Sequence, residues 1–150
     1  MSQKSIFNLE GKNYEKTQLK VSSGTIPSWL NGSYIKNGPG KYSVGNRELD
    51  HFFDGVALLQ KINFSNGNAN YVSKFLATRG YQFAKENSKL KYPLFSTIPK
   101  FRWWEYCREI FTGRLSGNNA NVNVIKVGKQ FYALTESIGM TEFNPETLDV

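Results

Sequence analysis

Few side chains in this chain could do chemistry, because its 150 residues include one histidine, His51, and one cysteine, Cys107. A protein metal site needs three or four clustered His, Cys or carboxylate ligands, and neither residue stands at a ligand spacing. One histidine also does not assemble a convincing Ser/His/Asp or Cys/His nucleophile set. The ligand count therefore favours His51 as a packed or hydrogen-bonded structural residue, and the chain alone shows no complete catalytic constellation.

Glu136 is the carboxylate with the most unusual position, because it ends the apolar strand pattern of residues 131–135. An unpaired carboxylate is costly to bury beside such a strand. Two interpretations stay open from the residues alone. An exposed glutamate at the end of a strand is the commoner case, and a paired carboxylate with a function is the other.

Short strands joined by tight turns are the elements that would position these residues. Residues 54–78 predict a hairpin, in which Asn66-Gly67-Asn68 is the turn and residues 71–76 form the returning strand. The outgoing strand alternates, which places four side chains on one face: Leu58, Gln60, Ile62 and Phe64.

A second hairpin is predicted between residues 122–127 and 130–134, with Gly128 at the first central position of its turn. Residues 140–143 look like a further strand, and a proline-containing turn at 144–148 leads into a new strand start. Because the chain stops just after that start, we expect it to be a truncated chain or a fragment.

The N-terminal third gives weaker signals. Residues 1–24 are polar with isolated apolar positions and predict an extended arm, and residues 26–32 predict a short turn packed by Trp29. Residues 33–37 predict a short strand ended by Gly38-Pro39-Gly40, which is a strong breaker but no phosphate loop, because proline lacks an amide donor. Short strands, tight turns and few helices together predict an all-β sandwich, barrel or propeller.

Residues 99–111 break the β pattern and predict a short amphipathic helix with Pro99 at its first position. Two interpretations stay open: a helix that packs on the sheet, and an interfacial helix whose tryptophans lie in a lipid headgroup layer. Basic residues favour an anionic lipid surface, whereas Glu105 and Glu109 weaken that case. The apolar side of the helix carries Trp103, Trp104, Cys107, Ile110 and Phe111.

The chain is basic and aromatic, with a formal net charge of +7 and 15% aromatic residues, which argues against disorder. The charge permits an anionic membrane surface, an acidic partner or a nucleic acid, but no basic-aromatic nucleic-acid module is present. A lone cysteine excludes an internal disulfide and fits a reducing compartment. No signal peptide and no stretch near the roughly 18 apolar residues of a membrane span are found.

Four motifs resemble landmarks of the carotenoid cleavage oxygenases, in the same order: GTIPSWLNGSYIKNGPG at 24–40, HFFDG at 51–55, YALTE at 132–136 and NPETL at 144–148. Lys36 stands where that family often has arginine. The resemblance covers residues 24–150 and looks closest to the animal-type branch, which includes the β-carotene oxygenases and the retinoid isomerohydrolase of the visual cycle.

The resemblance implies an all-β fold, the N-terminal portion of a seven-bladed β-propeller, with an arm over 1–23 and an incomplete propeller domain over 24–150. It also implies Fe(II) held by four histidines beyond Val150, and O2-dependent cleavage of a conjugated double bond of a carotenoid or apocarotenoid. Two alternatives remain: a retinyl-ester isomerohydrolase, and a non-catalytic membrane-surface lipid-binding protein of the same fold. The fragment itself is expected to be inactive.

The resemblance further implies roles for individual residues. Glu136 matches a glutamate that accepts a hydrogen bond from an iron-ligand histidine and fixes its tautomer. Thr135 and, by a looser alignment, Phe95 match residues of the substrate cleft, where an aromatic wall suits a polyene. We expect a carotenoid or retinoid, O2 and a membrane surface as partners, no nucleic acid, and a cytoplasmic, peripherally membrane-associated location. The expected membrane-contact residues are Lys100, Phe101, Arg102, Trp103, Trp104 and Phe111.

Overall fold

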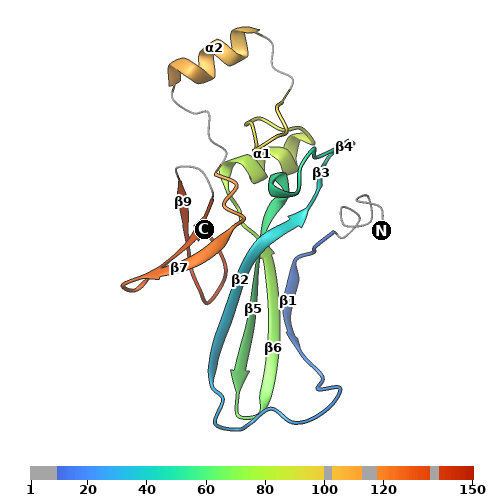
Figure 1. Ribbon diagram of the computed structural model, residues 1–150, viewed down its shortest axis with the longest axis vertical. Coiled ribbons are helices and arrows are strands. Elements are labelled where there is room, and N and C mark those ends of the chain that lie inside the picture. The colour runs from blue at the N-terminus through green and yellow to red at the C-terminus, as the bar shows by residue number, and fades with distance from the viewer. Residues whose placement is uncertain (1–9, 100–102, 113–117, 136–138) are drawn as a thin grey trace.

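The computed structural model describes residues 10–99, 103–112, 118–135 and 139–150, and its strands there form three antiparallel sheets (Figure 1). A four-stranded sheet has the order β1-β6-β5-β2, a small one pairs β3 with β4, and a third has the order β7-β8-β9. The strands are β1 (Tyr14–Gln18), β2 (Gly32–Lys41), β3 (Ser43–Val44), β4 (Arg47–Glu48), β5 (Val56–Ser65), β6 (Asn68–Phe75), β7 (Asn123–Val127), β8 (Gln130–Leu134) and β9 (Met140–Phe143). The helices are a 3-10 turn, η2 (Phe52–Asp54), and two α-helices, α1 (Arg79–Asn87) and α2 (Trp103–Thr112).

Both predicted hairpins are present, and local turn chemistry explains why. Asn66 and Gly67 have φ angles of 48° and 78°, the left-handed pair that a type I′ turn needs between β5 and β6. Gly128 has a φ of 61° at the turn between β7 and β8. The predicted strand at residues 140–143 is β9, which pairs with β8.

The proline-containing turn after β9 is also present, whereas the strand predicted to begin there is not assigned. The Asn144 side chain accepts a hydrogen bond from the Glu146 amide at 2.8 Å, and the Leu148 amide donates to the Asn144 carbonyl at 2.8 Å. Leu148 has a φ of 61°, which is a left-handed conformation that does not continue as a strand.

β2 corrects the prediction that Gly38-Pro39-Gly40 ends a short strand, because the strand runs through all three residues to Lys41. β2 lies at the end of the sheet order, and proline is tolerated on such an edge. Ala57, the residue opposite Pro39, has its carbonyl engaged by the Leu76 amide on the β6 side, so it needs no donor from Pro39. The register then shifts between Pro39 and Lys41.

Within the segment predicted as an extended arm, residues 14–18 form the exposed strand β1, which pairs with β6. The prediction that Trp29 packs its turn is wrong, because the Trp29 side chain is 77% exposed in this chain. Backbone and amide hydrogen bonds hold the turn instead: the Leu30 amide donates to the Pro27 carbonyl at 3.1 Å, and the Asn31 side chain donates to the Trp29 carbonyl at 3.2 Å.

The helices also differ from the sequence-based prediction. α2 overlaps the predicted region and ends one residue beyond it, at Thr112, but Pro99 precedes it in non-helical chain rather than forming its first position. α1 was not predicted, because its residues are mostly polar and none is fully buried. Tertiary contacts and capping stabilise it: the Thr78 hydroxyl accepts from the Tyr81 amide at 3.2 Å, and the Tyr81 ring stacks on Phe75.

The main core lies between the four-stranded and the three-stranded sheet. Lys61 crosses the same interface with a side chain that is almost fully buried, and its ammonium donates to the Pro145 carbonyl at 2.9 Å and to Glu146 at 2.8 Å. The hydrogen bond from Lys61 and its positive charge lower the pKa of the Glu146 carboxyl. The core residues are Ala57, Leu59, Leu76, Ala120, Ala133, Phe143 and Leu148.

Close packing of β2 on β5 gives the first testable prediction. A Cβ at Gly40 would lie 2.5 Å from the Leu58 Cβ, whereas a Cβ at Gly38 meets nothing within 4 Å. We expect Gly40→Ala to lower the free energy of unfolding by about 1–3 kcal/mol, as overpacking does. The matched control Gly38→Ala should change it by less than about 1 kcal/mol. Denaturant titration measures both, and equal effects would contradict the packing argument.

Candidate functional site

Phe95, the predicted cleft aromatic, lies in the loop between α1 and α2 and is 67% exposed. Its ring centroid is 5.1 Å from that of His51 and 5.8 Å from that of Phe53. Phe53 in turn contacts Phe52, whose ring lies 5.7 Å from that of Tyr42. An aromatic surface therefore runs from the loop onto the HFFDG segment, and it offers apolar contact to a ligand.

His51 has the structural role that the ligand count favoured. Its Nδ1 accepts a hydrogen bond from the Phe53 amide at 3.2 Å, which caps the 3-10 turn η2. The ring also packs against both Phe53 and Phe95, which contact each other, so the three rings form one cluster. His51 thus orients the aromatic surface.

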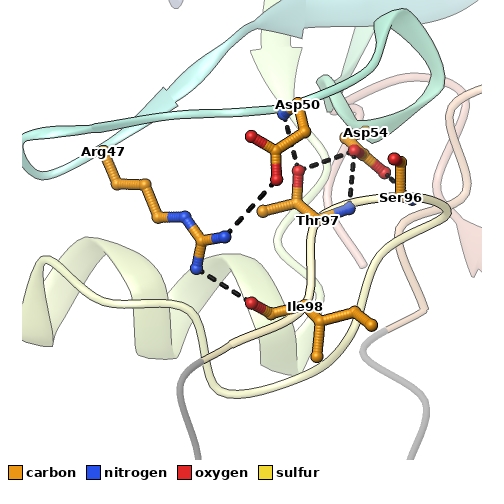
Figure 2. Close-up of polar contacts among 6 residues, drawn as sticks. All are labelled: Arg47, Asp50, Asp54, Ser96, Thr97 and Ile98. Atoms are coloured by element: carbon orange, nitrogen blue, oxygen red, sulfur yellow. Dashed lines mark hydrogen bonds and ion pairs between the residues drawn. The ribbon is translucent and has the colours of Figure 1, made fainter.

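Asp54 fixes the loop that carries Phe95 (Figure 2). Its carboxylate is fully buried, and one oxygen accepts from the Ser96 amide at 2.9 Å. The other oxygen accepts from the Thr97 amide at 2.9 Å and from the Thr97 hydroxyl at 2.7 Å. A buried carboxylate is tolerated only when it is well hydrogen-bonded, and here three donors come from the adjacent loop residues Ser96 and Thr97.

Two further contacts complete the attachment of this loop. The Asp50 amide donates to the Thr97 hydroxyl at 2.7 Å, so that hydroxyl bridges both aspartates. Arg47 reaches over the outside, donating to the Ile98 carbonyl at 3.0 Å and approaching the Asp50 carboxylate at 3.5 Å (Figure 2). The loop is consequently held from inside and outside.

Sequence reasoning missed the pairing of Asp54 with Thr97. The two residues are 43 positions apart, and no periodicity joins them. The available signal was Asp54 itself, an acidic residue set between aromatic residues and an apolar strand, where a charge needs partners. The HFFDG motif was recognised in the sequence, but the hydrogen bonds that its aspartate accepts from the loop at 96–97 were not predicted.

Thr135, the other predicted cleft residue, directly follows β8. Thr135 is half-buried there, and its methyl group would lie 3.7 Å from a Cβ placed at Gly139. Glu136 lies outside the described residues. The shared cleft of Thr135 and Phe95, and the histidine contact of Glu136, stay predictions.

The described side chains on the apolar side of α2 are open to solvent in this chain, and the side chain of Ile110 lies outside the described residues. Trp103 and Phe111 are 79% and 91% exposed, and Trp104 and Cys107 are exposed too. α2 lies at one end of the molecule, beyond the sheets (Figure 1). Of the other predicted membrane-contact residues, Lys100, Phe101 and Arg102 lie outside the described residues. The exposure of Trp103 and Phe111 speaks against a helix packed on these sheets.

Within residues 10–99, 103–112, 118–135 and 139–150, no three His, Cys, Asp or Glu side chains come together as a metal site. Those residues do not fit an iron by themselves, so no chemical step through a metal follows from them. In the same part of the chain, neither α-helix has the length and apolar character needed to cross a bilayer.

Comparisons with known proteins agree on one family. The family model described as retinal pigment epithelial membrane protein matches residues 8–150. The beta,beta-carotene 15,15'-dioxygenases of Mus musculus and Homo sapiens are each 33% identical over 144 residues, which is 90% of this chain. The chain spans only about a quarter of their length, 25% and 26%.

Solved structures show the same relationship. A mutant of the Synechocystis apocarotenoid oxygenase superposes with a TM-score of 0.80 at 28% identity, covering 98% of this chain and 30% of that one. A cobalt-substituted form of the Synechocystis enzyme gives 0.78 at 29% identity, covering 94% and 29%. The predicted all-β fold and partial propeller are therefore confirmed.

The buried hydroxyl of Thr97 supplies the second testable prediction. Thr97→Val keeps the shape but leaves the Asp50 amide without its acceptor and Asp54 without one donor. We expect a loss of about 1–3 kcal/mol in the free energy of unfolding. Thr97→Ser keeps the hydroxyl and should lose about 1 kcal/mol for its methyl group. Denaturant midpoints compare them, and a serine variant as unstable as the valine variant would refute the hydroxyl's role.

Proposed function

The chain belongs to the retinal pigment epithelial membrane protein family, which includes the carotenoid oxygenases, and we propose that it is part of an iron(II)-dependent oxygenase. This enzyme uses O2 to cleave a conjugated double bond of a carotenoid or apocarotenoid. The observation that carries the proposal is the family match over nearly the whole chain, with carotenoid dioxygenases among the relatives.

The chain's own part in this reaction is to shape the site rather than to hold the metal. Iron supplies O2 activation when bound, and its four histidine ligands are expected beyond Val150. Glu136 accepts a hydrogen bond from one of those histidines, which fixes the imidazole orientation. Phe95 and Thr135 line the cleft, where the exposed Phe95 ring presents an apolar wall to the polyene.

Substrate reaches the enzyme from a lipid surface in this proposal. A carotenoid has almost no free concentration in water, so an apolar path from a membrane to the cleft is needed. The exposed Trp103, Trp104 and Phe111 of α2 are suited to the headgroup layer, and the basic Arg108 on the same helix is suited to anionic lipid. The cytoplasmic location stays a prediction.

The metal and the reaction can be tested together. The full-length protein, expressed with iron, should bind one iron per chain and consume O2 while converting a carotenoid to aldehyde or ketone products. Glu136→Gln should weaken iron binding and lower turnover by about 10- to 100-fold, as loss of a ligand-orienting carboxylate does. Metal analysis and product chromatography measure both.

The outcomes separate the competing functions. Release of retinol from a retinyl ester without O2 uptake would replace cleavage by isomerohydrolysis. A full-length protein that binds lipid but neither iron nor O2 would refute the enzyme and leave the non-catalytic lipid-binding protein.

Membrane contact through α2 is the next testable prediction. In the full-length protein, Trp103→Ser and Phe111→Ser should each weaken binding to phosphatidylcholine–phosphatidylserine vesicles by about tenfold, because each removes a large apolar side chain from the contact. The matched control is Val127→Ser, which changes an exposed apolar side chain on β7. Sedimentation with vesicles measures binding, and a loss no larger than that of the control would remove α2 from the contact.

A further inference from the structure

The segments before and after α2 are both hydrogen-bonded to the same short stretch of chain around Asp54 and Gly55. On the entry side, Ser96 and Thr97 donate their amides to the Asp54 carboxylate. On the exit side, the Asn119 side chain donates to the Gly55 carbonyl at 2.9 Å. We call residues 53–57 the anchor segment and the chain between Thr97 and Asn119 the α2 excursion.

Hydrogen bonds to the anchor segment hold the exit side of the α2 excursion as well as its entry side. The Asn119 side chain also accepts from the Ala57 amide at 3.0 Å, so it bonds both a carbonyl and an amide of the anchor segment. Asn121 donates to the Phe53 carbonyl at 2.8 Å and to the Gly55 carbonyl at 2.7 Å, and it is almost fully buried. Side-chain amides thus bond the backbone of the anchor segment at Phe53, Gly55 and Ala57.

Core packing fixes the position of the anchor segment itself. A Cβ at Gly55 would lie 2.5 Å from Pro39 and 2.8 Å from the Tyr42 ring, so the anchor backbone lies directly against β2 and the residue after it. Ala120, between the two asparagines, belongs to the main core, and its carbonyl accepts from the Asn37 side chain. Both ends of the excursion therefore meet a rigid base.

We propose that Asp54, Asn119 and Asn121 are positioning residues for substrate uptake. They fix the two ends of the α2 excursion on one base, and thereby set where the lipid-facing side of α2 lies relative to Phe95. This inference rests on the proposed function, because it takes α2 as the lipid contact and Phe95 as part of the cleft. None of the three residues needs to touch the substrate.

Fixing both ends of a chain segment costs conformational entropy, and the hydrogen bonds at the two ends of the α2 excursion offset that cost. When one end loosens, α2 gains freedom of position without losing its own helix or its apolar side chains. Membrane affinity then changes little, whereas transfer from lipid to cleft becomes inefficient. A residue needed only for general stability would change both equally.

The test uses the full-length protein with Asp54→Asn for the entry side and Asn121→Ala for the exit side. Lys61→Met is the control for general stability, because Lys61 lies in the core but bonds the turn after β9 rather than the anchor segment. Amide hydrogen exchange should rise about tenfold in peptides covering the two ends, 94–99 and 118–122, for the two anchor variants, whereas the intact helix of 103–112 keeps its protection. The control should leave these peptides within about twofold of the wild type.

Turnover supplies the second readout, with the carotenoid presented either in vesicles or in detergent micelles. Asn121→Ala should raise KM for the vesicle-borne substrate about fivefold or more while kcat for the micellar substrate stays within about twofold. Asp54→Asn also loosens the loop that carries Phe95, so it should impair turnover of both forms of substrate. Unchanged exchange in both anchor variants, or equal losses of Asn121→Ala with both forms of substrate, would overturn the proposal. A wild-type protein without oxygenase activity would refute the proposed function alone, and the exchange comparison would still decide whether the anchor segment positions α2.

Discussion

A single buried carboxylate organises one whole end of this molecule. Asp54 carries a charge where water does not reach it, and such a charge is tolerated only with full hydrogen bonding. Its donors, Ser96 and Thr97, lie more than forty residues further along the chain. These hydrogen bonds hold the loop against the HFFDG segment, and the position of Phe95 follows from that contact.

Elements governed by neighbouring residues were the ones that could be predicted. The turns at Asn66-Gly67 and Gly128 carry their conformations in two residues, so both hairpins and their registers follow. β2 and α1 depend on the surroundings instead. Pro39 is acceptable because its strand lies at an edge, and α1 forms because Tyr81 has Phe75 to stack on. Local propensity predicts neither the edge position of β2 nor the stacking of Tyr81 on Phe75.

The same distinction applies to the candidate site. Ordered motifs pointed to the family, and through it to Glu136, Thr135 and Phe95, although their individual roles remain predictions. The hydrogen bonds that hold the site together, from Thr97 to Asp54 and from Asn121 to Gly55, join segments that no pattern links. A motif can identify an aspartate as important without revealing from which distant backbone amides it accepts hydrogen bonds.

Pro39 affects how the open edge of the four-stranded sheet can pair with other chains. β2 lies at the edge of its sheet, and an open edge is a template for adding a strand from another copy of the chain. Pro39 has no amide hydrogen to offer, and the register shift that follows it bends the ladder. An incoming strand would find its row of hydrogen bonds interrupted there, so Pro39 makes this edge a poor template for self-association.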